Sequence, residues 1–210
     1  MTSRLHLGTL LALAVTAWFA LLWWHETPVG WDHLGPFGLV LGFLVAVVGL
    51  FKRWWWSWSW LRGWFVQRPD LRGTWRVTLK SEWRDRRRKK TVEAIEGYMV
   101  VRQTLTTLNM RLLTRESSSR LVAHNVVRAD DGVYSVAAVF VNEPKLELRG
   151  KRSEIHYGAM MLQVQGQPPT TLEGHYWTDR DSRGTMLVDR RVDKLFDRFD
   201  EAEKRMKKIE

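Results

Sequence analysis

Charged residues are distributed very unequally along this chain, and this segregation restricts its fold more than any other feature. Residues 1–66 contain six charged residues, whereas residues 67–210 contain the other fifty. Such a division is typical of an apolar membrane segment joined to a water-soluble domain. The sequence has no cysteine, so disulfide scaffolds, cysteine zinc sites and thiol nucleophiles are excluded.

Two uncharged stretches lie in the first part of the chain. Leu5–Trp24 has twenty residues and His33–Phe51 has nineteen, close to the roughly 20 that a helix needs to cross a bilayer. We expect a two-helix transmembrane hairpin over residues 1–66 and a second domain over residues 67–210. The alternative is a cleaved signal peptide, but the first apolar run is longer than the roughly 7–15 residues of such a peptide. The positive-inside rule places both chain ends in the cytoplasm, because basic residues flank the hairpin: Arg4, Lys52, Arg53 and Arg62.

Ten of the 13 tryptophans lie at or before Trp64. The segment 54–64 is especially rich in them and predicts an interfacial belt, because indole rings favour the headgroup depth of a membrane. A platform that stacks nucleic-acid bases is the alternative. Gly38 and Gly42 have the small-xxx-small spacing that lets membrane helices approach closely, which favours self-association.

Residues 67–210 show short alternating segments separated by turn signals such as Asp130-Asp131-Gly132. In the first segment, Trp75, Val77 and Leu79 share one face. Eight segments without intervening helices predict an all-β domain, an antiparallel, lipocalin-like up-and-down barrel. The expected strands are Thr74–Ser81, Gly97–Leu105, Asn109–Arg115, Ser119–Arg128, Gly132–Asn142, Ile155–Gln165, Thr170–Arg180 and Gly184–Arg191.

The C-terminal segment predicts an amphipathic helix, since apolar residues recur at helical spacing from Val192 to Ile209. We expect this helix to pack on the barrel wall or to plug one end. The alternative is that its basic residues contact anionic lipid.

In a simple meander, odd strands end and even strands begin at the same rim, the one that lies away from the membrane. The inward phase of the strands becomes polar at this rim, which indicates a ligand site. Its hydroxyls, amide, imidazole and guanidinium can bind base edges and phosphate, Arg180 being the best phosphate donor. The predicted ligand-binding residues are Thr114, Ser119, Asn142, His156, Tyr176, Thr178 and Arg180.

Three further features support a ligand site at this rim. Aromatic side chains can stack on a base, namely Tyr134, Phe140 or Tyr176. Gly158 and Gly174 are expected to remove wall volume where a ligand sits. The basic loop 84–90 would attract an anion. The ordinary alternative is that rim residues are polar only because they are exposed to solvent.

Enzymatic motifs are missing from the sequence, and we expect neither an enzyme nor a cofactor or metal. It contains no Gly-x-Ser-x-Gly elbow, Walker loop, His-Glu-x-x-His pair or dinucleotide glycine fingerprint. His124, His156 and His175 lie on separate strands, and His124 and His175 are expected on the outer face. Asp179 and Asp181 flank a turn.

Five segments resemble the CD-NTase-associated two-transmembrane β-barrel effectors of CBASS antiphage defence. They are Leu71–Trp75, Tyr98–Thr104, Asn142–Pro144, His156–Gly158 and Leu172–Arg180. The resemblance implies that the barrel is a receptor for a cyclic dinucleotide made by a partner nucleotidyltransferase. It also implies that the ligand drives self-association into a homo-oligomer and disruption of the bacterial inner membrane, ending in cell death. We expect no DNA or RNA partner.

Two other interpretations stay open at this point. A membrane-anchored, lipocalin-like carrier would hold an apolar small molecule instead of a nucleotide. A structural scaffold would have a fully packed barrel and bind only protein.

Overall fold

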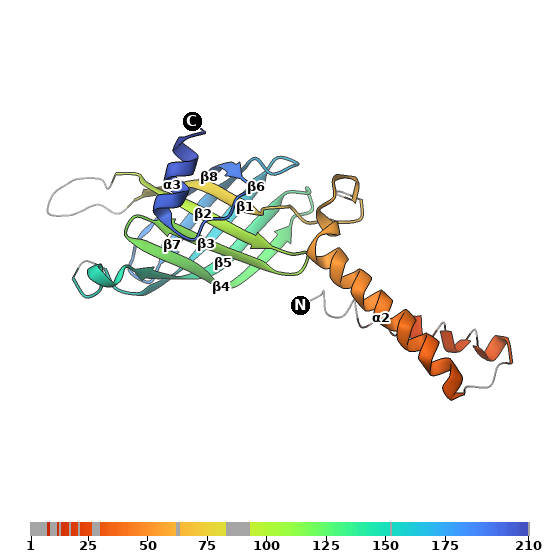
Figure 1. Ribbon diagram of the computed structural model, residues 1–210. Helices are drawn as coiled ribbons and strands as arrows, with labels where there is room; N and C mark the ends of the chain where they lie inside the picture. Colours follow the sequence, from red (N-terminus) through yellow and green to blue (C-terminus); the bar gives the residue numbers. More distant parts are fainter. Residues whose placement is uncertain are drawn as a thin grey trace. The chain divides into compact units, whose positions relative to one another are not determined.

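The structure is a computed structural model that describes residues 8, 12, 14–16, 18–20, 22–26, 30–61, 64–82, 93–151 and 153–209. The chain divides into two compact units, residues 1–56 and 57–210 (Figure 1). The boundary predicted between residues 66 and 67 stays a prediction.

The first unit contains α2 (Trp31–Arg53), which covers the second predicted span, His33–Phe51. Leu5–Trp24 lies only partly within the described residues, and those of its residues that are described are helical. None of the helices that the structure describes combines the length and hydropathy of a membrane span. The Trp-rich segment contains two 3-10 turns, Trp55–Ser57 and Ser59–Leu61.

The second unit is a closed antiparallel barrel of eight strands in sequence order, which confirms the predicted all-β barrel (Figure 1). β1 pairs with β8 from Thr74↔Val192 to Ser81↔Gly184 and so closes the sheet. The strands are β1 (Gly73–Ser81), β2 (Ile95–Gln103), β3 (Leu108–Thr114), β4 (Ser117–Arg128), β5 (Tyr134–Pro144), β6 (His156–Gln165), β7 (Thr171–Thr178) and β8 (Arg183–Val192).

The predicted alternation places the core inside the barrel. Trp75, Val77 and Leu79 are buried in one cluster with inward residues of the other strands. The end of the barrel where β1 begins is filled. Leu71 lies in this cluster, its N–H donates to Gln103 Oε1 at 2.8 Å, and Trp75 Nε1 donates to the Leu71 carbonyl oxygen at 2.8 Å. Buried side chains therefore occupy this end of the barrel.

A β-bulge in β4 makes one predicted facing wrong. The register with β5 shifts between Leu121 and Ala123, so His124 lies opposite Ala138, a residue of the core cluster. Residues directly opposite each other share a face, and one extra residue reverses the phase. His124 therefore follows the inner phase of β4 in register, although the residue itself is exposed. His175 is exposed on the outer face, as expected.

The C-terminal helix α3 (Phe199–Lys207) is shorter than predicted. Its expected first residue, Val192, instead ends β8 and pairs with Thr74. Phe199, Ala202 and Met206 are buried against the outer wall of β2 and β3, where they contact Tyr98, Val100 and Leu113. The prediction that this helix packs on the barrel wall is confirmed (Figure 1).

Asp70 is a buried carboxylate at the filled end of the barrel. Arg72 donates to both of its oxygens, from Nε at 2.9 Å and from Nη2 at 2.8 Å. Burial raises the pKa of Asp70, but the hydrogen bonds and charge of Arg72 and the charge of Arg191 outweigh it, so the pKa lies below the ordinary 3.8.

Replacing Asp70 by Asn should lower the free energy of unfolding by about 2 kcal/mol at neutral pH, since hydrogen bonds to charged groups contribute about 1.5–3 kcal/mol. A carboxylate whose pKa is lower in the folded than in the unfolded protein stabilises the fold at pH values above its unfolded-state pKa. This contribution is lost as the pH falls through the folded-state pKa. Urea unfolding followed by circular dichroism should show the difference between the two proteins shrinking in acid. A difference that does not change with pH contradicts the assignment.

Candidate functional site

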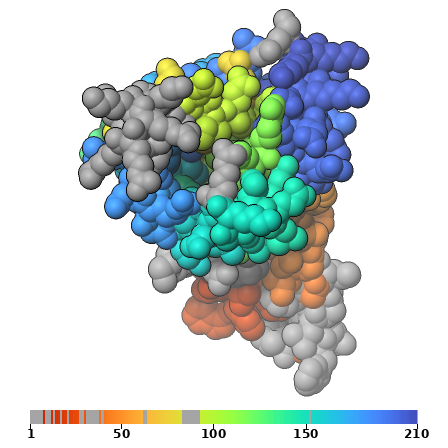
Figure 2. Space-filling view, turned by 90° about the vertical axis from the view of Figure 1, so that its left-hand side faces the viewer, coloured from red at the N-terminus to blue at the C-terminus, as the bar shows by residue number. Residues whose placement is uncertain are grey.

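A cavity of about 810 Å³ lies at the other end of the barrel, where odd strands end and even strands begin. Figure 2 looks onto this end, with α3 in dark blue and the segment after β5 in turquoise. This volume falls within the roughly 300–1,000 Å³ of small-molecule sites, and the barrel is therefore not fully packed. All seven predicted ligand residues line the cavity: Thr114, Ser119, Asn142, His156, Tyr176, Thr178 and Arg180.

The barrel register brings these residues together. Asn142 lies opposite Ser119 on β4 and opposite His156 on β6, so the three side chains share the inner face. Thr178 lies opposite Gly158, and Tyr176 lies opposite Met160 of the core cluster. Inward polar residues from consecutive strands thus form one continuous wall at the rim.

Ser119 and Asn142 form a buried polar pair on this wall. Ser119 Oγ donates to Asn142 Oδ1 at 2.7 Å, and the two residues are 7% and 8% exposed. Because the amide oxygen accepts this bond, the amide NH₂ of Asn142 is the group that can donate to a ligand. His156 Nδ1 lies 3.0 Å from the Glu154 carbonyl oxygen. A carbonyl only accepts, so Nδ1 is the donor of this hydrogen bond, and Nε2 is the ring nitrogen that remains for a ligand.

Thr114 and Thr178 have a shared role in the hairpin turns. Thr114 Oγ1 lies 2.9 Å from Ser117 Oγ, and Thr178 Oγ1 lies 2.6 Å from Ser182 Oγ. Both threonines line the cavity while their hydroxyls bridge the turns. They therefore fix the shape of the rim.

Arg180 lies in the turn that follows β7, and its Nη1 donates to Ser153 Oγ at 3.0 Å. The turn is held by Asp179, whose Oδ2 accepts from Tyr157 N–H at 3.0 Å. This supports the turn role expected for Asp179. The Arg180 guanidinium is exposed at the mouth, where its other N–H groups can bind an anion.

Two of the three predicted stacking residues line the cavity, Phe140 and Tyr176. Burial raises the pKa of Tyr176, a hydrogen bond with Ser81 lowers it, and the charge of Glu82 raises it, with a net increase. Tyr176 is therefore a neutral phenol at physiological pH. The prediction for Tyr134 is wrong, because it begins β5 at the opposite end, beside Arg128.

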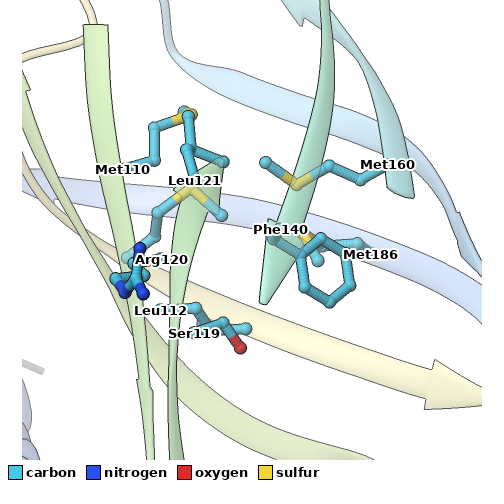
Figure 3. A pocket seen from close by; sticks show the side chains of 9 residues that line it. Met110, Leu112, Ser119, Arg120, Leu121, Phe140, Met160 and Met186 are labelled. Atoms are coloured by element: carbon cyan, nitrogen blue, oxygen red, sulfur yellow. The ribbon is translucent and has the colours of Figure 1, made fainter. Parts of the chain in front are cut away.

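A small apolar cavity of about 30 Å³ shares Leu112, Ser119, Phe140 and Met186 with the large one. In Figure 3 the side chains of Met110, Met160 and Met186 surround the same space as Phe140. Unbranched methionine side chains fill irregular gaps and adapt their shape. The floor of the site can therefore adjust to a ring that enters it.

The expected role of Gly158 and Gly174 is wrong. A Cβ at Gly158 would collide with the Phe140 ring, and one at Gly174 would collide with the Met161 carbonyl oxygen. Gly158 thus admits the Phe140 ring and Gly174 admits the backbone of β6, and neither opens space for a ligand.

Several residues that line the cavity are not among the predicted ligand residues, including Ser81, Arg115, Ser117 and Ser182. Ser81 follows the alternation of β1, because it lies two residues after Leu79 and therefore faces inward. The other three lie in or beside turns, where alternation gives no facing. The predicted basic loop, residues 84–90, lies outside the described residues. Among the residues that are described, no three His, Asp or Glu side chains cluster as a metal site would require.

Comparison with known proteins is consistent with this geometry. The family model described as "Cap15, cyclic dinucleotide receptor domain" matches residues 66–190, more than half of the chain and nearly the whole barrel. No curated protein matches the chain. The family is a receptor family and not a known catalytic one. The chain therefore belongs to the Cap15 cyclic dinucleotide receptor family.

Proposed function

We propose that the barrel binds a cyclic dinucleotide in the open cavity and acts as a sensor without catalysis. One observation carries the proposal: polar residues from β3 to β7 line a single cavity of about 810 Å³ at the open end of the barrel, in a chain of a cyclic dinucleotide receptor family. Burial of polar groups around an apolar floor is typical of small-molecule sites.

The chemistry of the ligand matches the cavity wall group by group. A cyclic dinucleotide carries phosphodiester anions, which Arg180 can bind through charge-assisted hydrogen bonds. Its bases present donors and acceptors to the amide of Asn142 and to Nε2 of His156. Phe140 and Tyr176 offer aromatic faces for stacking. The net charge of +10 favours approach of an anion.

The proposal extends to an effector of CBASS antiphage defence in the bacterial inner membrane. The uncharged stretches Leu5–Trp24 and His33–Phe51 would anchor the chain as two spans, with both termini and the barrel in the cytoplasm. Ligand made by a partner synthase would drive self-association and membrane disruption. A ligand shifts such an equilibrium only by its preference for the assembled state.

Replacing Arg180 by Ala should weaken the affinity for a cyclic dinucleotide at least about tenfold, because a phosphate loses a charge-assisted partner. Calorimetry on the purified chain measures the change. Arg128→Ala is the matched control, since this exposed arginine binds Gln67 at the opposite end of the barrel. Equal affinities for the wild type and Arg180→Ala would remove Arg180 from the site.

Replacing Asn142 by Asp keeps the size of the side chain but adds a negative charge to the cavity wall. We expect affinity to fall by at least about tenfold, because like charges repel strongly at low local dielectric. Asn125→Asp is the matched control, as Asn125 is exposed on the outer face. A thermal-shift titration measures both variants, and an equal effect of the two substitutions would contradict a site around Asn142.

A cyclic dinucleotide that the chain binds should release an entrapped dye when it is added to lipid vesicles that contain the chain. The same addition should increase chemically cross-linked oligomers. In the Arg180→Ala variant, the ligand concentration needed for release should rise at least about tenfold. Tight binding without dye release would support the receptor and overturn the membrane-disrupting role.

A further inference from the structure

Arg115 is an exposed cation at the cavity mouth. It lies between β3 and β4 and lines the cavity. Its side chain is 75% exposed, so the guanidinium can reorient at little cost.

Two residues of α3 contact Arg115. Its Nη2 lies 3.1 Å from Glu203 Oε1, and its guanidinium lies 5.8 Å from the centre of the Phe199 ring. Phe199 lines the same cavity and packs on Tyr98, with 5.4 Å between the ring centres. Although α3 lies on the outer wall of the barrel, it therefore reaches the mouth of the site.

Glu203 has a second partner on its own helix. Lys207 Nζ lies 3.0 Å from Oε1 of Glu203. The hydrogen bond of Lys207, the charges of Lys207 and Arg115 and the hydrogen bond of Arg115 lower the pKa of Glu203 although desolvation opposes them, so it is ionised at neutral pH. The carboxylate stays paired with Lys207 when Arg115 moves, which makes the exchange of partners easier.

We propose that Arg115 binds a phosphate of the ligand and that Glu203 of α3 competes with the ligand for this guanidinium. The inference rests on the proposed binding of a cyclic dinucleotide in the cavity. Exposed ion pairs are weak, whereas a phosphate in the cavity offers a planar guanidinium two oxygens at once. Coupling between binding events is reciprocal. Ligand binding therefore weakens the hold of α3 on the barrel.

A double-mutant cycle on the full chain tests this competition. The probes are cyclic di-AMP, cyclic di-GMP and cyclic GMP-AMP, and calorimetry with whichever binds gives the affinities. Glu203→Gln should tighten binding about threefold or more, and Arg115→Ala should weaken it about tenfold. In the Arg115→Ala background, Glu203→Gln should have no further effect. Glu201→Gln is the matched control, because it removes the same charge from an exposed position of α3.

Hydrogen exchange gives a second measure of the coupling. Amides of residues 199–207 should exchange several-fold faster when the ligand is bound, and this increase should be lost in Arg115→Ala. Unchanged or weaker binding by Glu203→Gln overturns the competition, as does an effect that persists without Arg115. If the wild type binds a probe and Arg115→Ala binds it equally well, the role of Arg115 is overturned and the proposed function stands. If the chain binds none of the probes, the proposed function itself is overturned.

Discussion

The pairing of β1 with β8 is the constraint on which the rest of the structure depends. This ladder joins the first strand to the last and so closes the sheet into a barrel. In a closed barrel each strand must alternate between an inner and an outer face, and inward side chains have only the core or an open end to occupy. The division between the apolar interior and the polar rim follows directly from closure.

The two ends of the barrel then take different roles. Leu71 and Trp75 fill one end. There Gln103 accepts a hydrogen bond from the Leu71 N–H, and Asp70 accepts one from the Arg72 N–H. At the other end the Ser119–Asn142 pair and the turn threonines line an open cavity. A filled end supplies packing that stabilises the barrel, so the open end can keep polar groups facing a space that a ligand can enter.

The helix α3 connects the outer wall to this open end. It is too short to be stable in isolation and depends on its buried face. Phe199 and the Arg115–Glu203 pair place its first turns beside the cavity. Under the competition proposed for Arg115, a change in the charge balance at the mouth would therefore alter the packing of this marginal helix on the outside of the barrel.

The strands and most of the candidate site could be predicted, because one alternating pattern reports both burial and facing. The seven rim residues followed from that pattern and do meet around one cavity. The pattern gave the wrong facing for His124 because a single bulge reverses the phase. It gave the wrong role for Gly158 because the ring that fills the space beside this glycine comes from another strand. Arg115 escaped it because a turn residue has no alternation.

The sequence by itself determined the eight strands, most of their inward faces and the end of the barrel that is polar, since these depend on the period of neighbouring residues along the chain. The tertiary structure alone decided which end is filled, how deep the cavity is and that α3 reaches its mouth. Those properties depend on contacts between residues far apart in sequence, such as Arg115 and Glu203, and no local pattern encodes the distance between them.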